Sequence, residues 1–139
     1  MSSPLIDTAA LASRLGLEDV AVIDCRADLV NPAWGEEEYQ RAHIPGAAYA
    51  HLDRDLSGPR TGTNGRHPLP DIDTLRQTFG RLGIDASTHV VACDQESGMW
   101  ASRLWWLLRW MGHTRVSVLD GGFAAWTAEG RPTASGIET

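Results

Sequence analysis

The chain has 139 residues, a length typical of one domain with a single hydrophobic core. Apolar residues make up 42% of it and charged residues 22%, which excludes the composition of a disordered chain. A formal net charge of −6, without a cluster of Lys or Arg, argues against nucleic acid as a partner. We therefore expect one folded domain over residues 1–139, with a frayed tail from about residue 133.

The first residues, MSSPLIDTAA, lack the basic stretch and long apolar run of a signal peptide, and no apolar segment approaches membrane-spanning length. These features predict a cytoplasmic protein that does not enter a membrane. Cys25 and Cys93 lie at the ends of apolar runs, where a reduced cysteine packs as a small hydrophobe. We expect two free thiols, no metal site and no cofactor.

Short apolar runs alternate with longer amphipathic stretches along the chain. The apolar runs predict strands at residues 20–23, 47–49, 89–92 and 116–119, with a weaker candidate at 5–6. Helical patterns cover residues 8–15, 35–42, 71–82, 98–111 and 123–129. Since near-continuous apolar strands alternate with helices, the sequence predicts an α/β fold, with a mostly parallel sheet covered on both faces.

Local signals mark several ends of these elements. Asp7 or Thr8 can cap the first helix, Asp71 can cap the third, and Gly83 is placed to stop it. The stretch at 57–70, SGPRTGTNGRHPLP, is rich in Gly and Pro and predicts an irregular surface loop.

Polar residues outside the main candidate loop have structural interpretations. Asp24 and Arg26 close the second strand, and we expect an ion pair that fixes the following loop. His43 follows a helix, where a histidine commonly caps the last carbonyl groups. The DGG segment at 120–122 lacks a full glycine fingerprint and is interpreted as a tight turn.

The segment VVACDQESGMWASRLWW, residues 90–106, predicts a buried strand, a loop and a helix, with Cys93 at the end of the strand. A phosphatase-type site needs an arginine six residues after the cysteine, but Met99 stands there and the first basic residue is Arg103. Asp94 and Glu96 are both acidic, and each carboxylate at ~5 Å from an anionic substrate costs about 3 kcal/mol. Cys93 is therefore poorly placed to ionise or to attack an anion.

The helix expected at 98–111 carries two apolar stripes. The first stripe has helical spacing and should face the sheet; its members are Trp100, Leu104, Leu107, Leu108 and Met111. Trp106 and Trp110 lie four residues apart and are rotated away from this stripe. Exposed aromatic pairs usually mark an interface, so we expect Trp106 and Trp110 to form one unless a loop of the same chain covers them.

Several ordered segments together resemble the rhodanese family. They are VIDCR, AHIPGA, DLSGPRTGTNGRHPLP, LGIDASTHVV and RLWWLLRWMGHTRVSVLDGGFAAWTAEGRP, and they span essentially the whole chain. More narrowly, they resemble the N-terminal half of two-domain thiosulfate or 3-mercaptopyruvate sulfurtransferases. The resemblance implies a five-stranded parallel α/β domain. It also implies a chemistry in which a cysteine after the fourth strand takes a sulfane sulfur as a persulfide and passes it to cyanide or another thiophile.

The family pattern places Asp94, rather than Cys93, at the nucleophile position. The active-site-like loop then consists of Asp94, Gln95, Glu96, Ser97, Gly98 and Met99. The resemblance thus implies a catalytically silent domain whose partner is a second, catalytic rhodanese domain, or a homo-oligomer. Two alternatives are an active single-domain sulfurtransferase that forms the persulfide on Cys93, and a binding module whose acidic loop holds a cationic or protein ligand.

Overall fold

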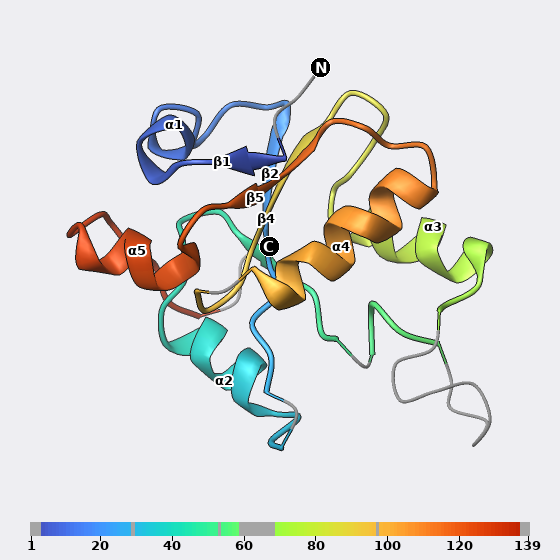
Figure 1. Ribbon diagram of the computed structural model, residues 1–139, viewed down its shortest axis with the longest axis horizontal. Helices are drawn as coiled ribbons and strands as arrows, with labels where there is room; N and C mark the ends of the chain where they lie inside the picture. The colour runs from blue at the N-terminus through green and yellow to red at the C-terminus, as the bar shows by residue number, and fades with distance from the viewer. Residues whose placement is uncertain (1–3, 29, 53, 59–68, 97, 137–139) are drawn as a thin grey trace.

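The computed structural model describes residues 4–28, 30–52, 54–58, 69–96 and 98–136, and the statements below concern these residues (Figure 1). Most of the surface loop predicted at 57–70, and Ser97 of the candidate loop, lie outside them. The strands are β1 (Leu5–Ile6), β2 (Val20–Asp24), β3 (Ala48–Tyr49), β4 (His89–Cys93) and β5 (Val116–Leu119). The helices are α1 (Thr8–Ala12), α2 (Trp34–Arg41), α3 (Ile72–Arg81), α4 (Met99–Trp110) and α5 (Gly122–Ala128).

The five strands form one sheet in the order β1-β5-β4-β2-β3, and every pair of neighbours is parallel. The predicted α/β fold and its parallel sheet are therefore confirmed. The predicted elements all occur, with small differences at their ends. The first helix, for example, ends at Ala12 instead of near residue 15, and the Ser13 hydroxyl there donates to the Ala10 carbonyl, 2.8 Å away.

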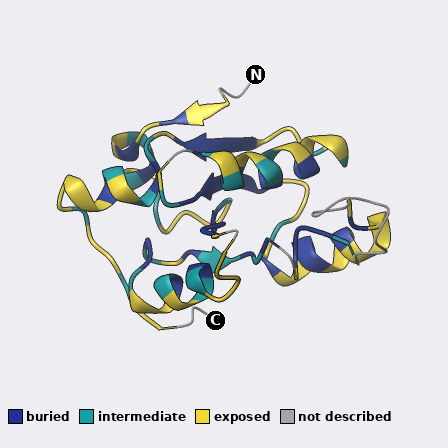
Figure 2. Ribbon diagram, turned by 60° about the horizontal axis from the view of Figure 1, so that its bottom comes forward, coloured by how far each residue is buried: buried dark blue, intermediate teal, exposed yellow. Residues whose placement is uncertain are grey.

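Helices cover both faces of the sheet (Figure 2). One buried cluster joins the sheet to α3 and α4, and the other joins it to α1, α2 and α5. Successive residues of β4 alternate between them: Val90 and Ala92 belong to the first cluster, whereas Val91 and Cys93 belong to the second. The stripe predicted on α4 also faces the first cluster, with its three leucines buried and Trp100 and Met111 packed against them.

Aspartate side chains begin two helices, as the sequence predicts. Asp7 accepts a hydrogen bond from the Ala10 amide at 2.7 Å, and Asp71 accepts one from the Thr74 amide at 2.9 Å. Both are N-cap residues, so each satisfies a backbone donor that the helix leaves unpaired. The third helix stops just before Gly83, which has a φ of +81°.

The C-terminal segment lies against the end of α2. Ala134 forms an antiparallel bridge with His43, and the Gly136 amide donates to the Gln40 carbonyl at 2.8 Å. The indole N–H of Trp126 also donates to the Pro132 carbonyl at 2.7 Å. The end of α2 and the residues just after it thus supply backbone partners to residues 134–136, and fraying of the tail from about residue 133 stays a prediction.

Across the described residues, no helix combines the length and the apolar character needed to span a bilayer. Cys25 and Cys93 are both buried and both free, as expected from the sequence.

The surroundings of His89 lead us to predict that the folded domain loses stability in acid. Its Nε2 lies 3.1 Å from the Ser117 hydroxyl, and its Nδ1 lies 3.4 Å from the Arg14 guanidinium. Burial lowers the pKa of His89 below its ordinary 6.5, and the charges of Arg14 and Arg115 lower it further. Because the folded pKa lies below the unfolded one, the neutral imidazole contributes its full stability above pH 6.5. That stability is lost as the pH falls below this value.

Thermal melts of the wild type and of His89→Gln between about pH 4.5 and 8 measure this contribution. We expect the difference in melting temperature to shift in favour of His89→Gln as the pH falls, since glutamine carries no proton to bind. Carboxylates titrate in both proteins, so their effects cancel in the difference between the two melting temperatures. A difference that stays constant across the range would contradict the prediction.

Candidate active-site loop

The loop after β4 closes on its own helix through Asp94. One oxygen of this buried carboxylate accepts the amide of Gly98 at 3.0 Å, and the other accepts the amides of Trp100 and Ala101 at 2.9 and 3.0 Å. These N–H groups lie at the N-terminal end of α4, where they have no partner within the helix. An anion is favoured there, and the Asp94 side chain supplies it from within the loop.

The backbone of the same loop is fixed by α5. The amides of Phe123 and Ala124 donate to the carbonyl oxygens of Asp94 and Gln95, at 2.8 and 2.9 Å. Gly122 approaches so closely that a Cβ there would lie 2.6 Å from the Asp94 carbonyl oxygen, and its φ is +59°. The predicted turn at residues 120–122 is thus confirmed, and it also lets α5 reach the loop.

A second contact ties the loop to the end of β2. The Gln95 side chain donates to the Ala27 carbonyl at 2.7 Å and accepts the Ala27 amide at 3.4 Å. The loops after two neighbouring strands are therefore joined by a side chain that bonds to backbone in both directions. Nothing in the order of residues along the chain signals this pairing.

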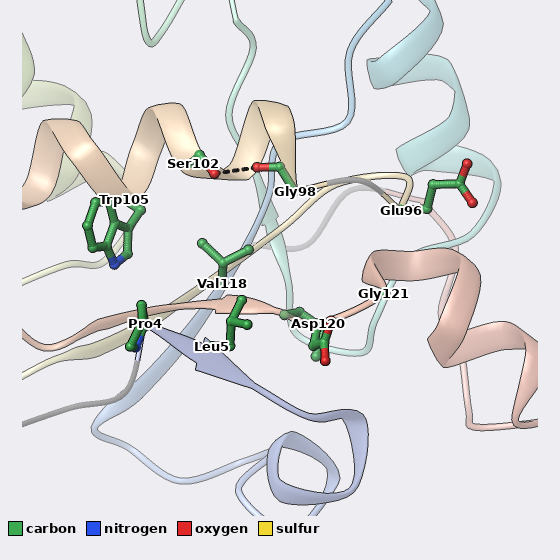
Figure 3. A pocket seen from close by; sticks show the side chains of 10 residues that line it. Pro4, Leu5, Glu96, Gly98, Ser102, Trp105, Val118, Asp120 and Gly121 are labelled. Atoms are coloured by element: carbon green, nitrogen blue, oxygen red, sulfur yellow. Dashed lines mark hydrogen bonds between the residues drawn. The ribbon is translucent and has the colours of Figure 1, made fainter.

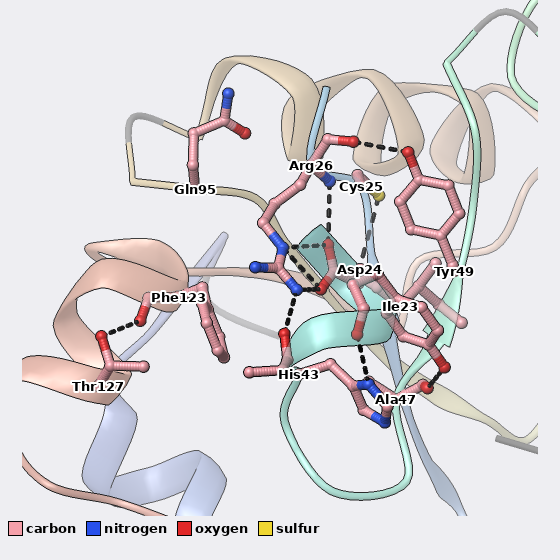
Figure 4. A network of polar contacts seen from close by, with 12 residues as sticks. Ile23, Asp24, Cys25, Arg26, His43, Ala47, Tyr49, Gln95, Phe123 and Thr127 are labelled. Atoms are coloured by element: carbon pink, nitrogen blue, oxygen red, sulfur yellow. Dashed lines mark hydrogen bonds and ion pairs between the residues drawn. The ribbon is translucent and has the colours of Figure 1, made fainter. Parts of the chain in front are cut away.

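The predicted ion pair between Asp24 and Arg26 is present and buried (Figure 4). The Arg26 Nε lies 3.1 and 3.0 Å from the two carboxylate oxygens, and another guanidinium nitrogen donates to the Ala42 carbonyl at 2.6 Å. The guanidinium also lies 4.2 Å from the centre of the Phe123 ring. Burial raises the pKa of Asp24, and Arg26 opposes this shift.

This pair corrects one expectation from the sequence, which placed no cation near Cys93. Asp24 and Cys93 are register partners in the sheet, so the β2 end brings Arg26 toward the β4 end. Burial nevertheless raises the pKa of the Cys93 thiol well above its ordinary value, and Asp24 raises it further. Arg26 offsets only part of this, since Asp24 neutralises its charge. Cys93 therefore stays protonated at neutral pH.

A groove of about 670 Å³ lies beside the candidate loop. Its lining is largely apolar, with Trp34, Met99 and Trp100 among its members. The charged residues that line it in the described part of the chain are Asp28 and Glu96, both acidic. The groove therefore repels anions, as the loop sequence alone predicted.

Two further predictions concern single side chains. His43 is fully buried, its Nδ1 lies 2.8 Å from the Tyr39 carbonyl oxygen, and its ring stacks on that of Tyr39 at 4.1 Å. It thus caps the end of α2 as predicted. Trp106 and Trp110 stack with ring centres 5.6 Å apart, and each keeps 45% of its surface exposed, so the described loops leave them open.

The sheet is parallel, and its fourth strand leads through a tightly bonded loop into the N-terminus of a helix. This is the class of fold that the resemblance implied. Comparison with known proteins agrees. The sequence profile of the rhodanese-like domain matches residues 7–129. The chain belongs to the rhodanese family.

Individual relatives are larger proteins. The chain is 45% identical, over 97% of its length, to a Pseudomonas aeruginosa protein named probable 3-mercaptopyruvate sulfurtransferase, and covers 48% of that protein. It is 42% identical over 71% of its length to the human 3-mercaptopyruvate sulfurtransferase, covering 33% of it. The structure of 3-mercaptopyruvate sulfurtransferase from Leishmania major superposes with a TM-score of 0.86 at 31% identity, over 95% of this chain and 36% of that one. The chain thus spans about half, or less, of the relatives that it matches.

Proposed function

We propose that this domain is the non-catalytic N-terminal half of a tandem-domain sulfurtransferase acting on thiosulfate or 3-mercaptopyruvate. The observation that carries the proposal is the Asp94 carboxylate, which accepts three N–H bonds at the start of α4. In the catalytic domains of the family, a cysteine stands at this position and its persulfide uses such donors. A carboxylate accepts the same bonds, but it has no sulfur to which a sulfane atom can be added.

The burial of Cys93 supports a silent loop. The Cys93 thiol packs in the apolar cluster under α1, α2 and α5, with 1% of the residue exposed. A nucleophile must ionise and reach its substrate, and burial opposes both. An active enzyme that forms its persulfide on Cys93 is therefore the weaker reading of this site.

An assay of the isolated chain tests the proposal. With thiosulfate or 3-mercaptopyruvate as donor and cyanide as acceptor, we expect thiocyanate to form no faster than in buffer. The Cys93→Ser variant should behave identically, and mass spectrometry after incubation with either donor should show no sulfur added to Cys93. The full-length Pseudomonas aeruginosa relative, assayed in parallel, checks the reagents. Turnover by this chain that disappears in Cys93→Ser would reverse the assignment.

The stacked pair of Trp106 and Trp110 supports a companion domain as the partner. Trp is strongly enriched at interfaces, and these two rings form an exposed aromatic surface on α4. The relatives are about twice as long as this chain, so a second rhodanese domain has the right size to cover the pair; a second copy of this chain is the other candidate. Reading the codons after Thr139 tests the choice. A continuing frame that encodes a rhodanese-like domain with a cysteine in place of Asp94 is expected, and an immediate stop codon excludes a companion in the same chain.

A further inference from the structure

The side of α4 that faces away from the sheet carries an apolar surface, which we call the outer face of this helix. Its residues recur at helical spacing and are exposed or partly exposed; they are Met99, Ser102, Arg103, Trp106, Arg109 and Trp110. Trp106 and Trp110 stack on each other near the C-terminal end, and Met99 at the N-terminal end is 61% exposed. Exposed aromatic and apolar side chains along one helix are typical of an interaction surface.

The two ends of the outer face have complementary shapes. At the N-terminal end, Met99 lines the groove of about 670 Å³, together with Trp34 and Trp100. At the C-terminal end, the Trp110 ring keeps 45% of its surface exposed. The helix between Met99 and Trp110 is about 16 Å long. One end therefore offers an apolar groove, and the other offers an exposed indole, which is the kind of side chain that fills such a groove.

The two ends also carry opposite charges. Asp28 and Glu96 line the groove, and Figure 3 shows the Glu96 side chain beyond the start of α4, directed away from the cavity drawn there. Arg109 is exposed near the other end, lies over the Trp105 ring at 5.0 Å, and has no ion pair among the described residues. No acidic residue lies within α4 itself. The outer face thus runs from an acidic groove to a basic, aromatic end.

We propose that the outer face binds a second copy of this chain, with the two α4 helices packed antiparallel. An antiparallel pair has a two-fold axis, so every contact occurs twice. Trp110 of each copy enters the groove of the other, and Arg109 of each copy lies near Glu96 of the other. A parallel pair would instead bring like charges together at both ends. The dimer of the isolated chain does not rest on the proposed function, although a companion domain would compete for the same face.

Sedimentation velocity of the whole chain, at concentrations up to about 1 mM, tests for the dimer. We expect a reversible equilibrium between monomer and dimer with a dissociation constant of about 10–100 μM, since the contact is small. Trp106→Ser with Trp110→Ser should keep the chain monomeric, while circular dichroism shows that it is folded. The control Arg76→Glu reverses an exposed charge on α3 and should dimerise as the wild type does.

Charge reversals test the antiparallel arrangement. Arg109→Glu and Glu96→Arg should each weaken the dimer about tenfold, because each places like charges together at both ends. An equimolar mixture of the two variants should dimerise as the wild type does, since the mixed dimer regains both ion pairs.

Three outcomes would contradict the proposal. A wild type that stays monomeric at about 1 mM would overturn the dimer. A dimer that survives Trp106→Ser with Trp110→Ser would overturn the choice of surface. A mixture of Arg109→Glu and Glu96→Arg that associates no more tightly than either variant alone would overturn the antiparallel arrangement.

Discussion

Asp94→Ala should lower the free energy of unfolding by about 4 kcal/mol, because three amides at the start of α4 lose their acceptor together. The Ala101 amide is buried, so water cannot replace the carboxylate there. Domains of this size are stable by about 5–15 kcal/mol, so the loss is a large share of the total. Urea unfolding followed by circular dichroism measures the change.

Asp7→Ala is the matched control. Asp7 also caps a helix, but in the described structure its side chain accepts a bond from a single exposed amide, so its loss should cost about 1 kcal/mol. Asp94→Asn should fall between the two, since an amide oxygen accepts some of the bonds while its NH₂ group faces a donor. If Asp94→Ala costs no more than Asp7→Ala, the carboxylate does not hold the loop.

Under the proposed function, the arrangement around Asp94 gives a physical reason for a non-catalytic domain to keep its loop. The amides that cradle a persulfide in a catalytic domain are here needed to hold the start of α4, and Asp94 satisfies them. The backbone of the same loop accepts bonds from the start of α5. The loop thus joins two helices on opposite faces of the sheet, and its structural role does not depend on chemistry at residue 94.

The sequence predicted those features that depend on neighbouring residues along the chain. Strand and helix positions followed from periodicity, and Asp7 and Asp71 followed from helix-cap chemistry. The assignment of Asp94 to the nucleophile position came from the resemblance and stays a prediction; the structure adds that three amides donate to its carboxylate.

Features that depend on strand order could not be predicted in this way. Parallel pairing of β2 with β4 brings Arg26 toward Cys93, although 67 residues separate them. The bond from the Gln95 side chain to the Ala27 carbonyl likewise depends on the adjacency of β2 and β4. No local pattern records either fact, since both follow from the topology of the whole sheet.

Gly35→Ala should cost about 3 kcal/mol or more, because α2 packs directly on the backbone that follows β2. A Cβ at Gly35 would lie 1.9 Å from the Arg26 carbonyl oxygen and 2.5 Å from the Tyr49 hydroxyl oxygen. These atoms cannot easily retreat. The Tyr49 hydroxyl donates to the same carbonyl at 2.8 Å, and the Arg26 side chain is fixed by Asp24. The substitution therefore disrupts the buried ion pair beside the candidate loop, and urea unfolding should show the loss.

Gly80→Ala provides the opposite control. Gly80 is an exposed residue within α3, and a Cβ there would meet no atom within 4 Å. Alanine should therefore raise stability by about 0.5–1 kcal/mol, through its higher helix propensity. Both substitutions add one methyl group to a helix, and they differ only in the atoms that this group would contact. If Gly35→Ala lowers the free energy of unfolding while Gly80→Ala raises it, the cost of Gly35→Ala comes from the contact with Arg26. If both substitutions raise it slightly, α2 does not approach the end of β2 this closely.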